Sequence, residues 1–182
     1  MASDPVEIVP YTPEWPRLFA RLAEDLRGAL GPVALRIDHV GSTAVPGLAA
    51  KPIIDIQISV ANFEPLDAYR APLASLRYTF RADNPERTKR YFREPRGSRR
   101  THLHVRRAGS FSEQASLLFR DYLRAHGQAR MEYAAVKQAA AARYPDAREQ
   151  YSAAKAPVIW EMLRLADAWA QASGWTPGTS DG

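Results

Sequence analysis

The chain has 182 residues, of which 46% are hydrophobic and 25% charged. This balance is typical of a globular protein with one domain, alone or with a helical extension, and excludes global disorder. The absence of cysteine excludes disulfides, thiolate nucleophiles and cysteine-ligated zinc, while a net charge of +5 favours anionic partners. No apolar run approaches the roughly 20 residues that cross a bilayer, and the N-terminus lacks a signal segment. We therefore expect a cytoplasmic protein without a membrane partner.

The first third of the chain predicts one helix and two strands. Apolar residues at helical spacing predict a helix over residues 13–30, with Thr12 as its cap and Gly31-Pro32 as its end. Residues 33–40 predict a strand, and residues 53–59 predict a second strand rich in β-branched side chains. Because side chains alternate along a strand, Ile54, Ile56 and Ile58 share one face of the second strand, and Ile53, Asp55, Gln57 and Ser59 share the other.

The connection between these strands contains the first candidate site. Gly41-Ser42 is a turn where a phosphate group can approach the backbone amides, because glycine has no side chain. Lys51 precedes the second strand, where it reaches a phosphate or lies in solvent. Asp55 is costly to bury alone, so it is paired, binds a metal or faces a cleft. A buried, hydrogen-bonded structural carboxylate is the alternative interpretation.

The middle of the chain predicts a helix over residues 64–77, with Asn62 as its cap, and three further strands at residues 78–81, 88–93 and 101–107. Together with the first two strands they indicate an α+β domain with a mixed sheet of about five strands. Basic residues dominate residues 81–107, and few acids accompany them there. In the last strand Arg100, His102, His104 and Arg106 share one face. If this strand lies beside Asp55, a histidine–aspartate pair is a general base, a metal site or a structural pair.

The C-terminal third predicts three helices. Ser110 and Glu113 form a capping box for a helix that ends near His126-Gly127. Helices over residues 130–144 and 146–173 follow, and Pro157 should kink or split the second of them. We therefore divide the chain into a core over residues 1–109, a helical unit packed on it over residues 110–174, and a disordered tail over residues 175–182.

Several motifs resemble those of known proteins. Gly41-Ser42 followed by Asp55 on a hydrophobic strand is similar to the signature of the nucleotidyltransferase superfamily. The whole of residues 39–56, His-Val-Gly-Ser-Thr-Ala-Val-Pro-Gly-Leu-Ala-Ala-Lys-Pro-Ile-Ile-Asp-Ile, resembles the GrpB family. Further similar segments are Thr101-His102-Leu103-His104-Val105, Phe119-Arg120-Asp121-Tyr122-Leu123, Tyr133 with Lys137, and Tyr151 with Lys155. The resemblance extends over residues 6–170, and it includes relatives fused to dephospho-CoA kinase.

The resemblance implies a nucleotidyltransferase-like sheet flanked by helices and a site shared between sheet and helices. Asp55 would bind Mg²⁺ and act with His104 in catalysis. The resemblance implies that Gly41 and Ser42 bind nucleotide or phosphate, and charge and position add Lys51, Arg100, His102 and Arg106 as candidates for the same role. The implied acceptor-side residues are Tyr133, Lys137, Tyr151 and Lys155. The chain departs from the superfamily pattern at Gln57, where a second acidic residue is expected, and in its later strand, which has histidine in place of a third carboxylate.

Three functions are consistent with these residues. The first is transfer of a nucleotidyl group from a nucleoside triphosphate to an unknown acceptor with Mg²⁺. The second is a catalytically silent module that binds a phosphorylated small molecule, such as a nucleotide or coenzyme A. The third is binding of nucleic acid, namely RNA, through the arginine-rich segment. The sequence does not define an oligomeric state.

Overall fold

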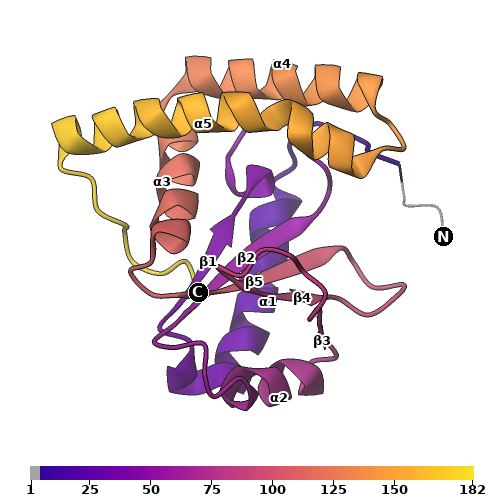
Figure 1. The fold of residues 1–182 in the computed structure, drawn as a ribbon, viewed down its shortest axis with the longest axis vertical. Helices are drawn as coiled ribbons and strands as arrows, with labels where there is room; N and C mark the ends of the chain where they lie inside the picture. The colour runs from indigo at the N-terminus through magenta and orange to yellow at the C-terminus, as the bar shows by residue number, and fades with distance from the viewer. Residues whose placement is uncertain (1–4) are drawn as a thin grey trace.

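A five-stranded mixed sheet forms the centre of the molecule in the computed structural model, which describes residues 5–182 (Figure 1). The strands are β1 (Arg36–Val40), β2 (Ile54–Val60), β3 (Thr79–Phe80), β4 (Arg90–Arg93) and β5 (Thr101–Arg107). They lie in the order β1-β2-β5-β4-β3; β2 and β5 are parallel, and the other neighbours are antiparallel. The predicted α+β fold with about five strands is confirmed.

Two N-terminal helices bury one face of the sheet. They are α1 (Glu14–Leu30) and α2 (Asp67–Ser75). Ile54, Ile56 and Ile58 are at most 1% exposed and belong to the same core cluster as the apolar residues of α1, so the predicted alternation of β2 is confirmed. Burying each such side chain contributes about 1.5 to 3 kcal/mol relative to leaving it in water.

Three C-terminal helices lie on the opposite side: α3 (Phe111–Ala125), α4 (Gly127–Arg143) and α5 (Arg148–Ser173). In Figure 1, α4 and α5 lie side by side along the top of the molecule. The β1–β2 connection fixes these helices to the sheet, because Val45 and Leu48 are buried in the same cluster as Tyr133 and Met162. Ser110 caps α3 as predicted, because its Oγ accepts a hydrogen bond from the Glu113 amide, but the Glu113 carboxylate accepts from the Gly109 amide and so does not complete the capping box.

Some element boundaries differ from the prediction. Gly31–Val33 form a 3-10 turn, so β1 starts only at Arg36. Asn62 lies too far from α2 to cap it, since that helix begins at Asp67. The helix α5 continues through Pro157 without a break. Among the residues that the structure describes, no helix combines the length and the apolarity needed to cross a membrane.

The C-terminal tail differs most from its prediction. We expected residues 175–182 to be disordered, but residues 180–182 lie along β1. Ser180 Oγ is 2.8 Å from both the amide nitrogen and the carbonyl oxygen of Ile37, and Asp181 accepts a hydrogen bond from the His39 amide at 3.0 Å. The reason is that β1 is an edge strand, whose free backbone groups can pair with another segment. Composition cannot reveal such pairing.

The tail also makes a partly buried ion pair, from which we predict how much the tail stabilises the fold. Arg120, 3% exposed, donates to Asp181 at 2.7 Å. We expect Asp181→Ala to lower the free energy of unfolding by about 1 to 3 kcal/mol, because it leaves Arg120 and the His39 amide with one acceptor fewer. Urea denaturation checks this. Asp83→Ala is the matched control: it breaks the exposed pair with Arg81 and should cost less than about 0.5 kcal/mol. Equal losses would contradict a role for the tail.

Candidate functional site

The turn after β1 approaches β2 closely because residue 41 is glycine. Gly41 has a φ of +71°, and a Cβ atom built on it would lie 2.8 Å from Asp55 Oδ2. Any other residue would therefore be strained and would also displace the carboxylate. The next residue, Ser42, starts a short 3-10 turn (Ser42–Ala44) and shares the wall of one cavity with Tyr133 of α4. The turn thus connects the carboxylate on the sheet to the helical layer.

A buried histidine supports this turn. Thr43 Oγ1 donates to the Ile53 carbonyl at 3.0 Å and accepts from His39 Nε2 at 3.0 Å. The His39 ring stacks on Phe19 of α1, and burial lowers its pKa to about 3, so the imidazole stays neutral. His39 therefore positions the turn and does not contribute a positive charge to the site.

One carboxylate contacts two imidazoles at the floor of the site. The parallel register of β2 and β5 places Asp55 beside His102 and Gln57 beside His104. Asp55 Oδ1 lies 3.1 Å from His102 Nδ1 and 3.2 Å from His104 Nε2. Burial by itself would raise the pKa of Asp55, but the two imidazole hydrogen bonds outweigh it and hold this pKa below its usual range. Burial lowers the pKa of His104. The cluster is thus an ionised carboxylate with imidazole donors.

Three of the four lysines in the sequence converge on the helical side of Asp55. Lys51 comes from the entrance of β2, Lys137 from α4 and Lys155 from α5. Lys51 Nζ and Lys155 Nζ lie 4.9 and 4.1 Å from the centre of the Tyr151 ring. Lys137 is only 2% exposed and donates to the Ala49 carbonyl. Positive charge from three separate elements is therefore gathered in one place.

The environment of these lysines makes them titrate near neutral pH. Burial, together with the positive charges around it, lowers the pKa of Lys137 to about 7. Burial also lowers the pKa of Lys51 and that of Lys155 to about 8, with Arg148 adding to the effect and the carboxylate of Asp55 opposing it. Burial raises the pKa of Tyr151 to about 12, so this phenol remains protonated. The lysines would regain full charge on meeting an anion.

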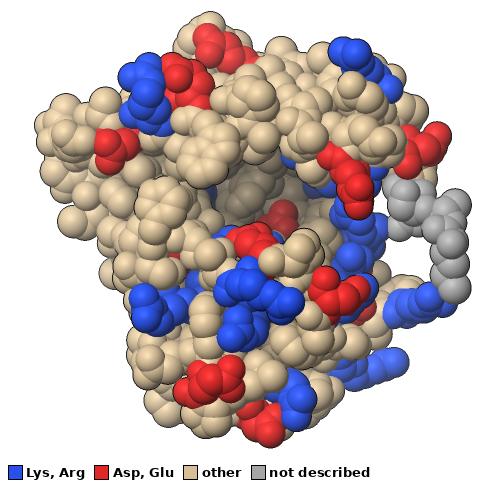
Figure 2. All heavy atoms as spheres, in the orientation of Figure 1, with Lys and Arg blue, Asp and Glu red and all other residues tan. Residues whose placement is uncertain are grey.

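These groups line one cavity of about 230 Å³. The predicted site residues in its wall are Gly41, Ser42, Lys51, Asp55, His102, Tyr133, Lys137, Tyr151 and Lys155. Figure 2 shows the hollow between the helical layer and the sheet, with acidic atoms in its depth and basic atoms along its wall. A second hollow of about 180 Å³ shares Lys51 and Ile53 with this cavity and adds Arg100 and Arg148. The two hollows are therefore adjacent.

The remaining predicted residues lie outside the cavity wall. His104 reaches the cavity only through its contact with Asp55. Arg100 borders the adjacent hollow and pairs with Glu94 at 3.1 Å. Arg106 pairs with Glu86 at 3.0 Å and lines neither hollow, so the structure does not bring it to the site.

Arg148 is a site residue that the sequence prediction missed. It lies three residues before Tyr151 and seven before Lys155, so helical spacing could have identified it. Tyr91 of β4 is a second residue beside the site that sequence reasoning did not identify. Its ring centroid is 5.5 Å from that of His102 and 5.4 Å from that of His104. These contacts arise from the pairing of β4 with β5, and no local sequence pattern indicates that pairing.

The arginine-rich segment is less free than its composition suggests. We expected few acids to accompany it, yet the fold supplies partners from within the segment and from outside it. The pairs are Arg81 with Asp83, Lys89 and Arg106 with Glu86, Arg90 with Glu64, and Arg93 and Arg100 with Glu94. The segment is therefore a mixed-charge surface.

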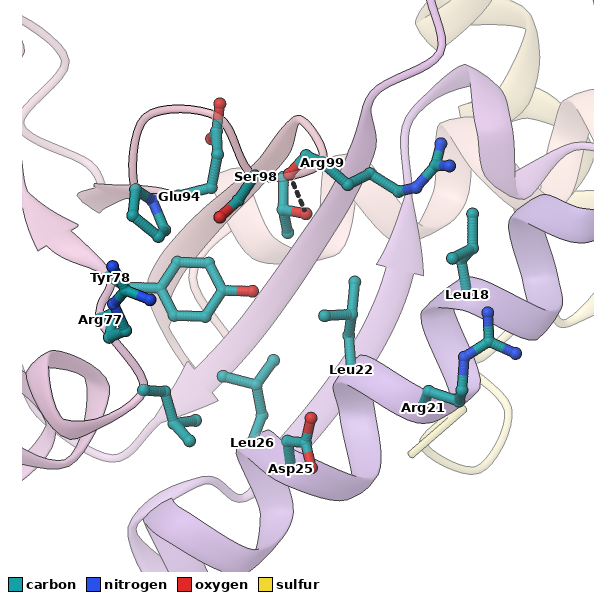
Figure 3. Close-up of a pocket in the computed structure, with 13 residues that line it drawn as sticks. Leu18, Arg21, Leu22, Asp25, Leu26, Arg77, Tyr78, Glu94, Ser98 and Arg99 are labelled. Carbon is teal, nitrogen blue, oxygen red and sulfur yellow. Dashed lines mark hydrogen bonds between the residues drawn. The ribbon is translucent and has the colours of Figure 1, made fainter.

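A larger hollow of about 450 Å³ lies elsewhere, beside α1 (Figure 3). Figure 3 shows Leu18, Leu22 and Leu26 along its α1 wall and the ring of Tyr78 opposite them. None of the predicted site residues lines it. Its wall also contains acidic and basic side chains, namely Arg21, Asp25, Arg77, Glu94 and Arg99. The smaller cavity beside Asp55 is the better candidate, because the predicted site residues converge there.

The donor atoms around Asp55 do not suit a pair of magnesium ions. Mg²⁺ prefers oxygen ligands in octahedral geometry, and two-metal sites need several carboxylate oxygens. Asp55 is the only acidic residue that the described part of the chain contributes to the cavity wall. Gln57 is completely buried and does not line the cavity. Its amide nitrogen donates to the Glu113 carbonyl at 3.2 Å, and its amide oxygen is buried without a hydrogen-bond partner among the described residues. Among the described residues, Asp55, His102 and His104 form the one cluster of acidic and histidine side chains close enough to share a metal.

Comparison with known proteins identifies close relatives. Pseudomonas aeruginosa UPF0157 protein PA4798 is 43% identical over 163 residues, which is 88% of this chain and 67% of that protein. The dephospho-CoA kinase of Mycolicibacterium paratuberculosis is 36% identical over 202 residues, covering 97% of this chain and 50% of the kinase. UPF0157 protein YqkA of Bacillus subtilis is matched over 48% of its length, so the chain spans about half of some curated relatives.

Solved structures show the same fold. The crystal structure of the conserved protein GrpB from Enterococcus faecalis superposes with a TM-score of 0.81 at 30% identity, covering 90% of this chain and 99% of that one. The GLD-2/RNP-8 complex has a TM-score of 0.53 at 16% identity, covering 82% of this chain and 60% of that one, a likeness of fold alone. The fold is nucleotidyltransferase-like, as predicted. Residues 5–165 match the family described as GrpB protein, and the chain belongs to the GrpB family.

Proposed function

We propose that this chain binds a phosphorylated small molecule whose phosphate groups occupy the cavity beside Asp55. The observation that carries the proposal is the convergence of Lys51, Lys137 and Lys155 in a chain that otherwise uses arginine for nearly all its positive charge. Lysine is a compact point charge, and burial shifts its pKa readily. One buried and two half-buried ammonium groups would repel one another without an anion. A polyphosphate supplies the negative charge that stabilises them.

The size of the two hollows suggests how such a ligand divides between them. A cavity of about 230 Å³ is smaller than the 300 to 1,000 Å³ typical of sites for drug-sized ligands, and it suits a phosphate chain. The remainder of the ligand, such as a nucleoside, would extend past Lys51 into the hollow beside Arg100 and Arg148. Relatives named dephospho-CoA kinase support a phosphorylated metabolite as the ligand class.

Nucleotidyl transfer with Mg²⁺ is the second candidate function. The contact between Gly41 and Asp55 in a nucleotidyltransferase-like fold favours it. A single carboxylate in the cavity wall, with Gln57 buried outside that wall, does not fit a pair of magnesium ions, so we assign no catalytic step to that metal. Titration calorimetry with nucleoside triphosphates separates the two functions. Equal affinity with Mg²⁺ and with EDTA supports the binding module, whereas strict Mg²⁺ dependence with release of pyrophosphate supports the transferase.

Replacing the most buried lysine tests the binding function. We expect Lys137→Met to weaken binding of inorganic triphosphate roughly 10- to 100-fold, because a charge-assisted hydrogen bond contributes about 1.5 to 3 kcal/mol. Its melting temperature should stay level or rise, since an apolar group replaces a buried amine. Lys89→Met is the matched control, as Lys89 pairs with Glu86 outside the cavity. If both variants bind triphosphate like wild type, the cavity is not the anion site.

The lysine pKa values also predict a pH dependence of binding. Free lysines with pKa values of about 7 and 8 are charged below pH 7 and lose their protons as pH rises through 8. An anion favours the charged forms, so affinity should be highest near pH 6.5 and fall toward pH 9, by up to about tenfold per pH unit for each lysine that must take up a proton. Sulfate is the probe, because its charge is constant over this range. An affinity independent of pH would overturn the assignment.

The glycine of the turn provides a third test. Gly41→Ala should weaken triphosphate binding by about tenfold or more, because its methyl group would collide with Asp55 Oδ2 and displace the floor of the cavity. Gly97→Ala is the matched control: Gly97 has a φ of +80°, and a Cβ there meets nothing within 4 Å. Both variants should lose about 1 kcal/mol of stability to backbone strain, but only Gly41→Ala should lose affinity. Equal affinities would show that the turn is not part of the site.

A further inference from the structure

We propose that Asp55, His102 and His104 bind one divalent transition-metal ion, with zinc as the best match, through one carboxylate oxygen and two imidazole nitrogens. This inference does not depend on the phosphate-binding function, because the three ligands come from the sheet alone. It departs from the magnesium chemistry expected of a nucleotidyltransferase-like fold. Imidazole is a ligand of zinc, copper, iron and nickel, whereas magnesium prefers oxygen.

The spacing of the three side chains fits a shared ion. Ligands held about 2.1 Å from one ion are separated by about 3.0 Å in an octahedral site and 3.4 Å in a tetrahedral one. Asp55 Oδ1 lies 3.1 Å from His102 Nδ1 and 3.2 Å from His104 Nε2. All three ligand atoms lie within 4.8 Å of one another, so a small rotation of the imidazoles closes the set. The metal would replace the two hydrogen-bonding protons.

Hydrogen bonding to Asp55 leaves both imidazoles incompletely satisfied. His102 Nε2 and His104 Nδ1 are buried and have no hydrogen-bond partner among the described residues. These are the ring nitrogens opposite the proposed ligand atoms, so an ion bound to His102 Nδ1 and His104 Nε2 would leave them as N–H donors for water. By contrast, Asp38 on β1 is a structural carboxylate: it is fully buried and accepts two hydrogen bonds from Arg36.

An ion can reach this cluster and would keep an open coordination position. The side chains of Asp55, His102 and His104 are 28%, 12% and 17% exposed, and Asp55 and His102 line the cavity. Three protein ligands with a fourth position open to water or substrate are the arrangement of catalytic zinc sites. Here the open position would face the space enclosed by the three lysines. A bound anion could then contact both the metal and the lysines.

The nearby lysines should weaken binding of the metal when no anion is present. Lys155 is close enough to interact electrostatically with Asp55. Replacing Lys155 by methionine should therefore strengthen metal binding and weaken triphosphate binding. These opposite effects allow the metal site and the phosphate site to be judged separately.

The experiment is titration of the full-length protein, freed of any affinity tag and treated with EDTA, with Zn²⁺ by calorimetry and with Co²⁺ by visible absorption. We expect one ion per chain, no comparable binding of Mg²⁺, and tighter Zn²⁺ binding by Lys155→Met. His102→Gln, His104→Gln and Asp55→Asn should each weaken Zn²⁺ binding by at least about tenfold. His126→Gln is the control, since this histidine lies at the end of α3 and contacts Tyr122. It should bind Zn²⁺ like wild type.

Two results would overturn the proposal. One is unchanged Zn²⁺ affinity in His102→Gln or His104→Gln with a native circular dichroism spectrum. The other needs no variant and therefore covers the case in which these variants do not fold. It is an X-ray absorption spectrum of the zinc-loaded wild type without two imidazole ligands at about 2.0 to 2.1 Å.

Discussion

The carboxylate of Asp55 is the negative charge on which the arrangement of the site depends. It accepts hydrogen bonds from two imidazoles on the sheet. Its negative charge also raises the pKa of Lys51 and of Lys155, which burial lowers. Its position in turn depends on Gly41, because no other residue leaves room for Oδ2. Electrostatic interactions are strong in a partly buried site, so a small displacement of this carboxylate would change the charge state of its neighbours. Strand, turn and helices are therefore coupled through one side chain.

The β1–β2 connection makes this coupling rigid. Val45 and Leu48 are buried among the C-terminal helices, whereas Ala50 is buried in the core beneath the sheet. The carbonyl of Ala49, between these two anchors, accepts from Lys137 of α4, and the carbonyl of Ala44 accepts from Arg124 of α3. A short segment is thus fixed in two hydrophobic cores at once. The cavity between sheet and helices is consequently held open by packing on both sides, which is the preorganisation that a binding site requires.

The sequence was sufficient for the parts of this structure that depend on local pattern. Alternation along β2 and β5 correctly grouped Asp55 with Gln57, and His102 with His104, because the side-chain period of a strand is fixed. That these two strands are neighbours could be stated only as a condition, because parallel pairing joins segments more than 40 residues apart and leaves no local sequence pattern. The position of Arg106 was misjudged for the same reason: its partner, Glu86, lies in a loop that only the fold brings near. The tail was misjudged because its binding surface is the edge of β1.

The replacement of an expected acid by Gln57 follows from how α3 packs on the sheet. Glu113 stands over β2, where its carboxylate accepts from Ser59 at 2.6 Å and from the Gly109 amide at 2.8 Å, and its backbone carbonyl accepts from Gln57. A carboxylate at residue 57 would lack a proton to donate and would be buried beside a second carboxylate, which is strongly unfavourable. The amide nitrogen of Gln57 instead donates the hydrogen bond that a carboxylate could not, while its oxygen has no partner among the described residues. Because α3 covers this end of the sheet, one metal-binding position of the superfamily pattern is lost. The groups that remain on the open part of the strand face are one carboxylate and two imidazoles. The shared fold constrains where a ligand can bind, while these side chains decide what it can be.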